Sequence, residues 1–245
     1  MVSSFYFDKG DFTPVQQDAL VLEVVAAGKN EDALVVVCDG IGGLKAGEYA
    51  SSYVTMRIRN WFYGAYLKHR KKRYGRRRIE KDCIRMLYDC NRYLQCYGKE
   101  YGIKLGTTMT MVLLQDRRLF VKYLIFHVGD SRAYRIGKKC KRLTRDDSYG
   151  GRALYRCIGS FPWQNVLKRH GWLRKGENLL LCSDGFWRTL KEEELAESFG
   201  RKGVLRDRNK LSGIQLKKRL RKLGQEGRVR GERDNQAAVI VKRED

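Results

Sequence analysis

The chain has 245 residues, 42% of them hydrophobic and 11% aromatic, a composition that is typical of a globular fold and excludes a disordered chain. Lysine and arginine number 51 against 28 acidic residues, so the formal net charge is +23 and the surface is expected to attract polyanions. Only 2 prolines occur and no apolar run is long enough to cross a membrane, so we expect one domain over residues 1–245 with no membrane span.

Three short apolar segments begin the chain, and each predicts a strand: residues 5–7, 19–26 and 33–38. A turn at Gly28 favours a hairpin between the second and the third. The third strand ends abruptly in Asp39, which is followed by Gly40-Ile41-Gly42-Gly43. Glycines let the backbone approach a ligand closely, and a carboxylate beside bare carbonyls suits a hard cation. A plain Asp-Gly turn is the alternative.

Helices and further strands follow, distinguished by apolar spacing of three and four residues in the helices and by short apolar runs in the strands. In chain order we expect helix 46–66, a basic run 68–78, helix 79–97, strands 108–114 and 119–127 with a turn at 115–118, strand 132–136, a mobile loop with one helical turn at 148–159, strand 178–182, helix 191–199, a basic region 201–233 containing an amphipathic helix, and strand 237–241. Segregated helices and hairpin-linked strands favour an α+β fold with antiparallel sheets over a doubly wound parallel one.

Four aspartates stand at the ends of predicted strands: Asp18, Asp39, Asp184 and Asp234. Strand ends from distant parts of a sheet can meet at one edge, and buried carboxylates in a cluster are costly unless cations neutralise them. Oxygen ligands with no histidine or cysteine nearby favour Mg²⁺ or Mn²⁺ over zinc. Each aspartate alone also has a plain turn interpretation, so the prediction depends on the set.

The 7 cysteines form no Cys-x-x-Cys pair, which favours reduced, mostly buried thiols in a cytoplasm over a disulfide framework or a zinc site. Cys182 and Arg188 have the spacing of cysteine-dependent phosphatases. However, Leu181 precedes the cysteine and Asp184 lies within the loop, where a carboxylate would repel phosphate. A buried strand end is therefore the favoured interpretation of Cys182.

Five motifs with strand context occur in order along the chain: Asp39-Gly40-Ile41-Gly42-Gly43, Gly106-Thr107-Thr108, Gly129-Asp130-Ser131-Arg132, Ser183-Asp184-Gly185 and Asp234-Asn235. Together they resemble the motifs of the type 2C metal-dependent protein serine/threonine phosphatases, in the compact form of the bacterial branch. The resemblance covers essentially the whole chain. It implies an antiparallel β-sandwich flanked by helix pairs, in a four-layer α-β-β-α arrangement.

The resemblance also implies a catalytic site with two divalent cations, Mn²⁺ or Mg²⁺. Asp39 would bridge the two ions, and Asp184 and Asp234 would complete the shell of the first. The carbonyl of Gly40 would bind the second ion, which Asp18 would reach through a water.

Asp130, together with Asp184, matches the position of a third ion in bacterial relatives. Arg132, Asn235 and the Thr107 segment would support the site without performing chemistry.

The implied activity is hydrolysis of phosphoserine and phosphothreonine by a water that the two ions share. The expected partners are phosphorylated proteins, among them a cognate kinase or its substrates, and we expect a cytoplasmic monomer. Aromatic residues are sparse in the two basic runs, so nucleic-acid binding is not expected.

The chain departs from the family pattern at several positions. Thr13 stands where an arginine that grips phosphate is usual, with Lys9 as the nearest basic alternative, and Gln16-Gln17 replaces a pair that usually begins with asparagine. Ile41 and Asp147 remove two candidate imidazole acids. These changes keep open a catalytically weak phosphatase-like scaffold that binds phosphoproteins or other polyanions, and a further alternative is an anion-binding module built on the basic runs.

Overall fold

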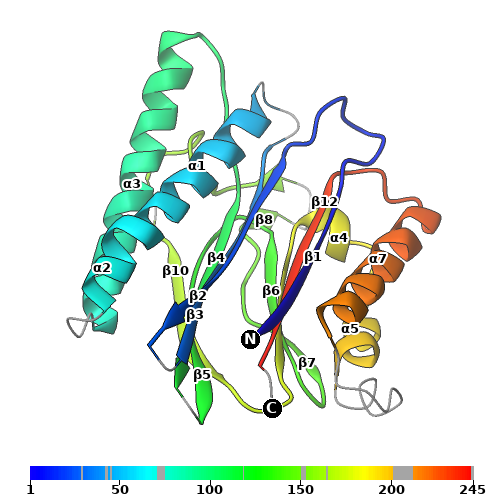
Figure 1. The fold of residues 1–245 in the computed structure, drawn as a ribbon. Coiled ribbons are helices and arrows are strands. Elements are labelled where there is room, and N and C mark those ends of the chain that lie inside the picture. The colour runs from blue at the N-terminus through cyan, green and yellow to red at the C-terminus, as the bar shows by residue number, and fades with distance from the viewer. Residues whose placement is uncertain are drawn as a thin grey trace.

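Two antiparallel sheets lie face to face in the computed structural model, and helices cover both outer faces (Figure 1). The structure describes residues 1–28, 30–41, 44, 46–70, 75–117, 119–149, 153–163, 165–200 and 212–243. The expected glycines Gly42 and Gly43, and parts of both basic runs, lie outside these residues. The α+β class and the four-layer α-β-β-α arrangement are confirmed.

Each large sheet has five strands. The first contains, in spatial order, β1 (Val2–Asp8), β12 (Gln236–Lys242), β11 (Asn178–Cys182), β6 (Arg132–Ile136) and β7 (Cys140–Arg142). The second contains β10 (Leu167–Leu173), β5 (Phe120–Val128), β4 (Met109–Arg117), β3 (Asn30–Asp39) and β2 (Asp18–Ala27). The predicted hairpin between the second and third strands of the chain is confirmed, with Asp18 opposite Asp39.

The helices form two groups, one on each outer face (Figure 1). Over the second sheet lie α1 (Gly47–Trp61), a π-helical segment η1 (Phe62–Tyr66), α2 (Leu67–Arg70) and α3 (Arg76–Glu100). Over the first sheet lie α4 (Asp184–Trp187), α5 (Glu192–Phe199) and α7 (Gly213–Val229). The apolar faces predicted from sequence are the buried ones, as with Leu216, Leu220 and Leu223 of α7.

Strand β3 shows why the second sheet has an almost continuous apolar run. Val35 and Val37 face the core between the two sheets, whereas Leu34 and Val36 face the core beneath α1 and α3. Because successive side chains point to opposite faces and both faces are covered, every position from Ala33 to Cys38 is buried and apolar. The strand therefore delivers Asp39 from the centre of the molecule to one end of the sandwich.

The segment expected as a loop with one helical turn is different. Within it, β8 (Ser148–Tyr149) pairs with β9 (Ala153–Leu154), and none of its described residues is helical, so the predicted helical turn is not found there. The turn expected at 115–118 is also displaced, because Gln115, Asp116 and Arg117 still pair with β5. Strands β7 and β10 and the single turn α4 were not predicted.

No helix in the described part of the chain combines the length and the apolar character that a membrane crossing requires.

Candidate metal centre

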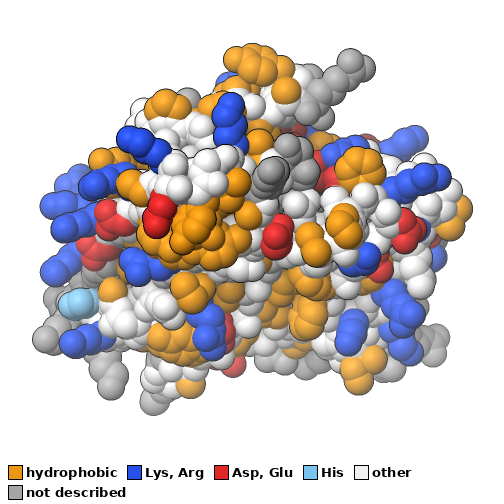
Figure 2. Space-filling view, turned by 90° about the horizontal axis from the view of Figure 1, so that it is seen from above, with side chains coloured by type: hydrophobic (Ala, Val, Ile, Leu, Met, Phe, Trp, Pro, Cys, Tyr) orange, Lys and Arg blue, Asp and Glu red, His pale blue; other side chains and the backbone are white. Residues whose placement is uncertain are grey.

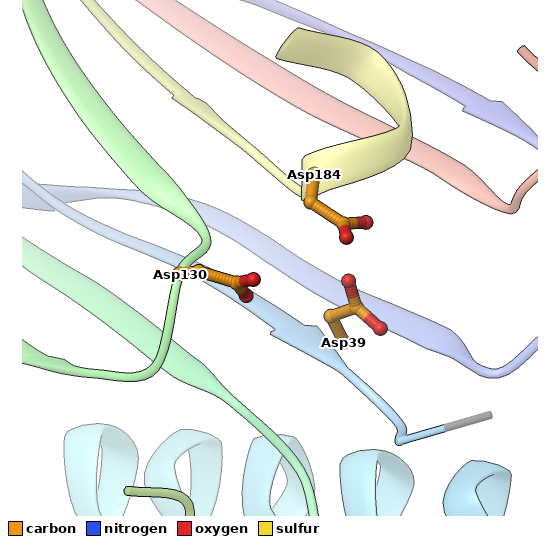
Figure 3. Close-up of side chains that lie close together, drawn as sticks. All are labelled: Asp39, Asp130 and Asp184. Atoms are coloured by element: carbon orange, nitrogen blue, oxygen red, sulfur yellow. The ribbon is translucent and has the colours of Figure 1, made fainter. Parts of the chain in front are cut away.

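Three aspartates from distant parts of the sequence converge at the end of the sandwich where β3 ends. Asp39 is the last residue of β3, Asp130 lies in the turn between β5 and β6, and Asp184 is the first residue of α4. Their carboxylates point toward one another (Figure 3), and one oxygen from each lies within 4.8 Å of the others. This spacing allows a single cation to contact more than one of them.

Threonines fix the backbone that carries Asp39. The Asp39 N–H donates to Thr108 Oγ1 at 3.0 Å, and the Asp39 carbonyl accepts from the Thr108 N–H at 2.8 Å and from Thr107 Oγ1 at 2.9 Å. Thr108 Oγ1 in turn lies 2.8 Å from Ser131 Oγ, beside Asp130. The threonine segment, for which a supporting role was predicted, thus holds the backbone of Asp39 in place through hydrogen bonds.

Two glycines allow the surrounding segments to approach one another. A Cβ atom on Gly40 would lie 2.4 Å from the Gly47 carbonyl oxygen, and one on Gly185 would lie 2.2 Å from the Asn235 carbonyl oxygen. Only glycine fits at such approaches. Gly185 thus lets the segment of Asp184 lie directly against the segment of Asp234.

Asp18 lies beside the cluster and is 5% exposed. Its Oδ2 accepts from Ser183 Oγ at 2.7 Å. Its Oδ1 is buried and has no hydrogen-bond partner among the described residues. A buried carboxylate oxygen without a donor is costly, so a water or a cation is the expected partner at this atom.

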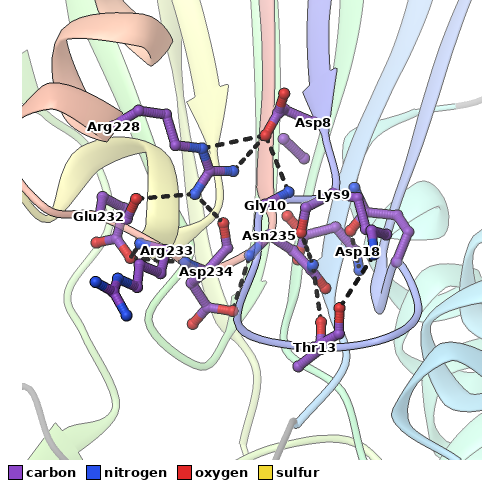
Figure 4. A network of polar contacts seen from close by, with 12 residues as sticks. Asp8, Lys9, Gly10, Thr13, Asp18, Arg228, Glu232, Arg233, Asp234 and Asn235 are labelled. Carbon is purple, nitrogen blue, oxygen red and sulfur yellow. Dashed lines mark hydrogen bonds and ion pairs between the residues drawn. The ribbon is translucent and has the colours of Figure 1, made fainter.

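Asp234 lines the same cavity but does not belong to the tight group of three. A network ties its backbone to the first strand (Figure 4): Arg228 donates to the Asp234 carbonyl at 2.7 Å and pairs with Asp8. The assignment of Asp234 to the first ion and of Asp130 to a third ion stays a prediction.

Burial and mutual repulsion govern the protonation of these groups. Burial, followed by the neighbouring carboxylates, raises the pKa of Asp39 well above its ordinary value. Burial also raises the pKa of Asp18 and of Asp184, and it raises the pKa of Asp130 to about 7. A cation bound among these groups would remove this penalty.

The carboxylates open into a cavity of about 580 Å³. Its walls are lined by Asp39, Ile41, Leu44, Lys104, Thr108, Asp130, Ala153, Leu154, Ser160, Phe161, Asp184 and Asp234. Acidic groups therefore occupy part of the wall and apolar groups another part. Lys104 was not singled out from the sequence, since a single lysine after a helix carries no pattern.

The donor set fits a hard divalent cation. All the charged donors are carboxylate oxygens, three of them already share one spot, and Asp18 presents an oxygen that lacks a donor. Mg²⁺ and Mn²⁺ prefer oxygen ligands.

Thr13, one of the departures from the family pattern, takes a structural role, and Lys9, its basic alternative, contacts its own loop. Thr13 Oγ1 accepts from Asn235 Nδ2 at 3.0 Å, and the Lys9 amine lies 3.3 Å from the Pro14 carbonyl of its own loop. Lys9 is not among the described residues that line the cavity, so the structure gives it no role at phosphate.

The acidic pair Asp146 and Asp147 forms ion pairs with arginines and does not belong to the group of three aspartates. Asp146 pairs with Arg132 at 2.7 Å. Asp147 is buried, pairs with Arg156 and accepts from the Gly129 N–H at 3.0 Å. Arg132 also lies 3.2 Å from the ring centre of Trp187, whose Nε1 donates to the Asp130 carbonyl at 3.0 Å. This agrees with the predicted supporting role of Arg132.

The cysteine-phosphatase alternative is not supported. Cys182 is fully buried at the end of β11, and burial raises the pKa of its thiol, whereas a nucleophile needs a lowered one. Arg188 pairs with Asp184 instead of forming a phosphate cradle with the thiol. All 7 cysteines are free.

Comparison with known proteins points to one family. A family model described as protein phosphatase 2C matches residues 14–222. Among curated proteins, the chain is similar to the serine/threonine phosphatase stp of Listeria innocua, with 25% identity over 207 residues, 75% of this chain and 78% of that protein.

Solved structures support the same fold. The chain is similar to the serine/threonine phosphatase Stp1 from Staphylococcus aureus, with 23% identity, a TM-score of 0.79 and coverage of 100% of this chain and 96% of that one. It is also similar to the catalytic domain of the phosphatase PstP, solved with 2 manganese ions, with 21% identity, a TM-score of 0.71 and coverage of 97% and 96%.

Proposed function

The chain belongs to the protein phosphatase 2C family, and on that premise we propose that it hydrolyses phosphoserine and phosphothreonine in proteins with two divalent cations, Mn²⁺ or Mg²⁺. The observation that carries the proposal is the convergence of Asp39, Asp130 and Asp184 on one spot at the cavity. The similar phosphatase PstP was solved with 2 manganese ions, which supports the number of ions.

Each carboxylate has a separate part in holding the ions. Asp39, on the fixed end of β3, lies opposite Asp18 on β2 and close to Asp184, and would contact both ions. Asp184 and Asp234 would hold the first ion, and Asp18 would act through a water at its free oxygen. When bound, the ions supply an activated water nucleophile and neutralise charge on the phosphoryl group.

The remaining walls of the cavity favour a phosphorylated side chain within a polypeptide. Lys104 adds positive charge, which attracts an anionic substrate. Ile41, Leu44 and Phe161 present apolar surface, which would contact residues on either side of the phosphorylated one and exclude water. A cognate kinase or its substrates, a cytoplasmic location and a monomeric state remain predictions.

The test is hydrolysis of p-nitrophenyl phosphate and of a phosphothreonine peptide with Mn²⁺, with and without chelator. We expect activity in Mn²⁺, its loss in chelator, and a fall of at least about 100-fold in kcat/KM for Asp39→Ala, because the substitution removes a carboxylate from the cluster.

Asp89→Ala is the matched control, since it removes the same charge from an exposed position on α3. Equal activity of Asp39→Ala and Asp89→Ala, or full activity in chelator, would overturn the proposal. Tight binding of phosphopeptide without turnover by the wild type would favour the scaffold alternative.

A further inference from the structure

A cationic side chain already lies against the acidic cluster. Arg188 follows α4 directly and donates through Nη2 to Asp184 Oδ2. Its Nη1 lies 3.5 Å from Glu232 Oε2 and 3.8 Å from Asp234 Oδ2. The guanidinium thus contacts one of the three convergent carboxylates and approaches a second residue that lines the cavity.

The charge of Arg188 influences the pKa of two carboxylates of the cluster. After burial, Arg188 is the largest influence on the pKa of Asp184, and it acts to lower it. It also lowers the pKa of Asp130, against the opposing effects of burial and of Asp184. The side chain therefore offsets part of the repulsion among the carboxylates, which is the effect that a bound cation has in a cluster of this kind.

We propose that Arg188 takes the place of the third divalent ion, the one that Asp130 and Asp184 would share, so that the protein binds two divalent ions where its carboxylates would otherwise hold three. The proposal rests on the function proposed above. A guanidinium bound to a carboxylate oxygen removes that oxygen from the available ligands, and its charge disfavours a second cation placed beside it.

A different role for Arg188 predicts the opposite result. If the guanidinium only orients Asp184 as a metal ligand, its removal loosens that ligand and weakens metal binding, by about 10- to 100-fold for a supporting residue of this kind. If the guanidinium occupies the place of an ion, its removal frees a carboxylate oxygen and lowers the local positive charge. The protein then binds more ions, or binds them more tightly.

The experiment counts Mn²⁺ bound per chain, by equilibrium dialysis with electron paramagnetic resonance detection of free Mn²⁺, for wild type, Arg188→Gln and Arg230→Gln. Arg230 is the matched control: its side chain is 40% exposed against 42% for Arg188, and it pairs with Glu194 on α5. We expect Arg188→Gln to bind one additional Mn²⁺, or to tighten its weakest site by at least about 10-fold. Arg230→Gln should match the wild type.

Thermal unfolding supplies the second readout. Arg188→Gln should unfold at a lower temperature than the wild type in chelator, and Mn²⁺ should remove that difference, because the ion replaces the lost charge. The proposal is overturned if Arg188→Gln binds Mn²⁺ as the wild type does or more weakly, or if Mn²⁺ cannot restore its folding. Wild type that neither binds Mn²⁺ nor hydrolyses phosphate esters would instead overturn the proposed function, and this inference with it.

Discussion

Asp130 links the protonation of the metal centre to the stability of the protein. Burial raises its pKa to about 7, and the adjacent carboxylates of Asp184 and Asp146 act in the same direction. In an unfolded chain an aspartate has a pKa of about 3.9. The folded, metal-free protein therefore binds more protons than the unfolded chain across the interval between these two values.

Stability of the metal-free protein should fall as pH rises through this interval. The contribution of Asp130 to the free energy of unfolding is fully present below about pH 4 and is lost as pH passes about 7. The reason is that the free energy of unfolding decreases with rising pH wherever the folded state binds more protons than the unfolded chain. We expect urea denaturation in chelator to show lower stability at pH 7.5 than at pH 5.5.

Two controls test the part of Asp130 in this slope. Asp130→Asn, which cannot titrate, should make the slope shallower, the remainder coming from the other buried aspartates. Mn²⁺ should stabilise the wild type more at pH 7.5 than at pH 5.5. A free energy of unfolding that rises between these pH values, equally in wild type and Asp130→Asn, would show that other groups govern the pH dependence.

At the level of residues, the sequence identified the carboxylates more readily than their neighbours. Asp39 ends an apolar strand and Asp184 follows another after a single serine, so their place at strand ends could be inferred from the pattern alone. Lys104 was not assigned to the site, because nothing in its local sequence shows that the chain folds back beside aspartates from other elements. Arg188 lies four residues after Asp184, but their ion pair was not expected because no helical turn was predicted there. Thr13 had no predicted structural partner, and the structure gives it Asn235.

The packing of α7 on β1 depends on a close approach at Gly224. A Cβ atom at this position would lie 2.3 Å from a ring carbon of Tyr6 on β1 and 2.9 Å from Gln236 Oε1 on β12. These atoms belong to neighbouring strands, so relief would require the helix to move away from the sheet. Leu216, Leu220 and Leu223, which bury their side chains beneath α7, would move with it.

We therefore expect Gly224→Ala to destabilise the protein by about 1–3 kcal/mol, the usual cost of overpacking a well-packed site. Gly64→Ala is the matched control in the helical segment η1, where a Cβ would meet nothing within 4 Å. It should be neutral or stabilise by up to about 1 kcal/mol, because alanine favours helix more than glycine does. Chemical denaturation of both variants, with Mn²⁺ present, measures the difference; equal effects of the two substitutions would contradict the close-approach argument.

The elements that could not be predicted depend on tertiary contacts. Strand β10 has the sequence Leu-Lys-Arg-His-Gly-Trp-Leu and is mostly exposed, so it lacks an apolar alternation. It is an edge strand that is recognisable only through its backbone pairing with β5. The hairpin of β8 and β9 has two residues on each side, which is too short to produce a pattern. Strand β11, buried at every position, was predicted with its observed bounds.

The position of the metal centre follows from the arrangement of the whole molecule. Asp39 ends a strand of the second sheet, whereas Asp184 and Asp234 adjoin β11 and β12 of the first. The two sheets share an apolar core between them, and each has a second core beneath its own helices. The site is therefore assembled only when the two sheets dock. The sequence predicted most of the strands, the α+β class and a cluster of aspartates at one edge, whereas the part of each aspartate in holding ions came from the family resemblance.

The charge of the molecule bears on which substrates reach the site. Figure 2 views the end of the sandwich at which β3 ends and shows Lys and Arg side chains along both flanks of this face, with hydrophobic side chains between them. The net charge of +23 adds a long-range attraction for anions to this local arrangement. Phosphorylated segments rich in Asp and Glu should therefore be captured faster than neutral ones.

Salt distinguishes this steering from recognition within the cavity. Raising ionic strength from about 0.01 M to about 0.15 M shortens the screening length from about 30 Å to about 8 Å. We expect kcat/KM for an acidic phosphothreonine peptide to fall by about 10-fold or more over this range, mainly through KM, because association is slowed. A neutral peptide of the same length, with the same residues beside the phosphothreonine, should change by about 2-fold at most, because only its phosphate is attracted. The same fall for both peptides would place the salt sensitivity at the phosphoryl group and the cations that hold it. It would also show that the Lys and Arg side chains on the two flanks do not determine substrate choice.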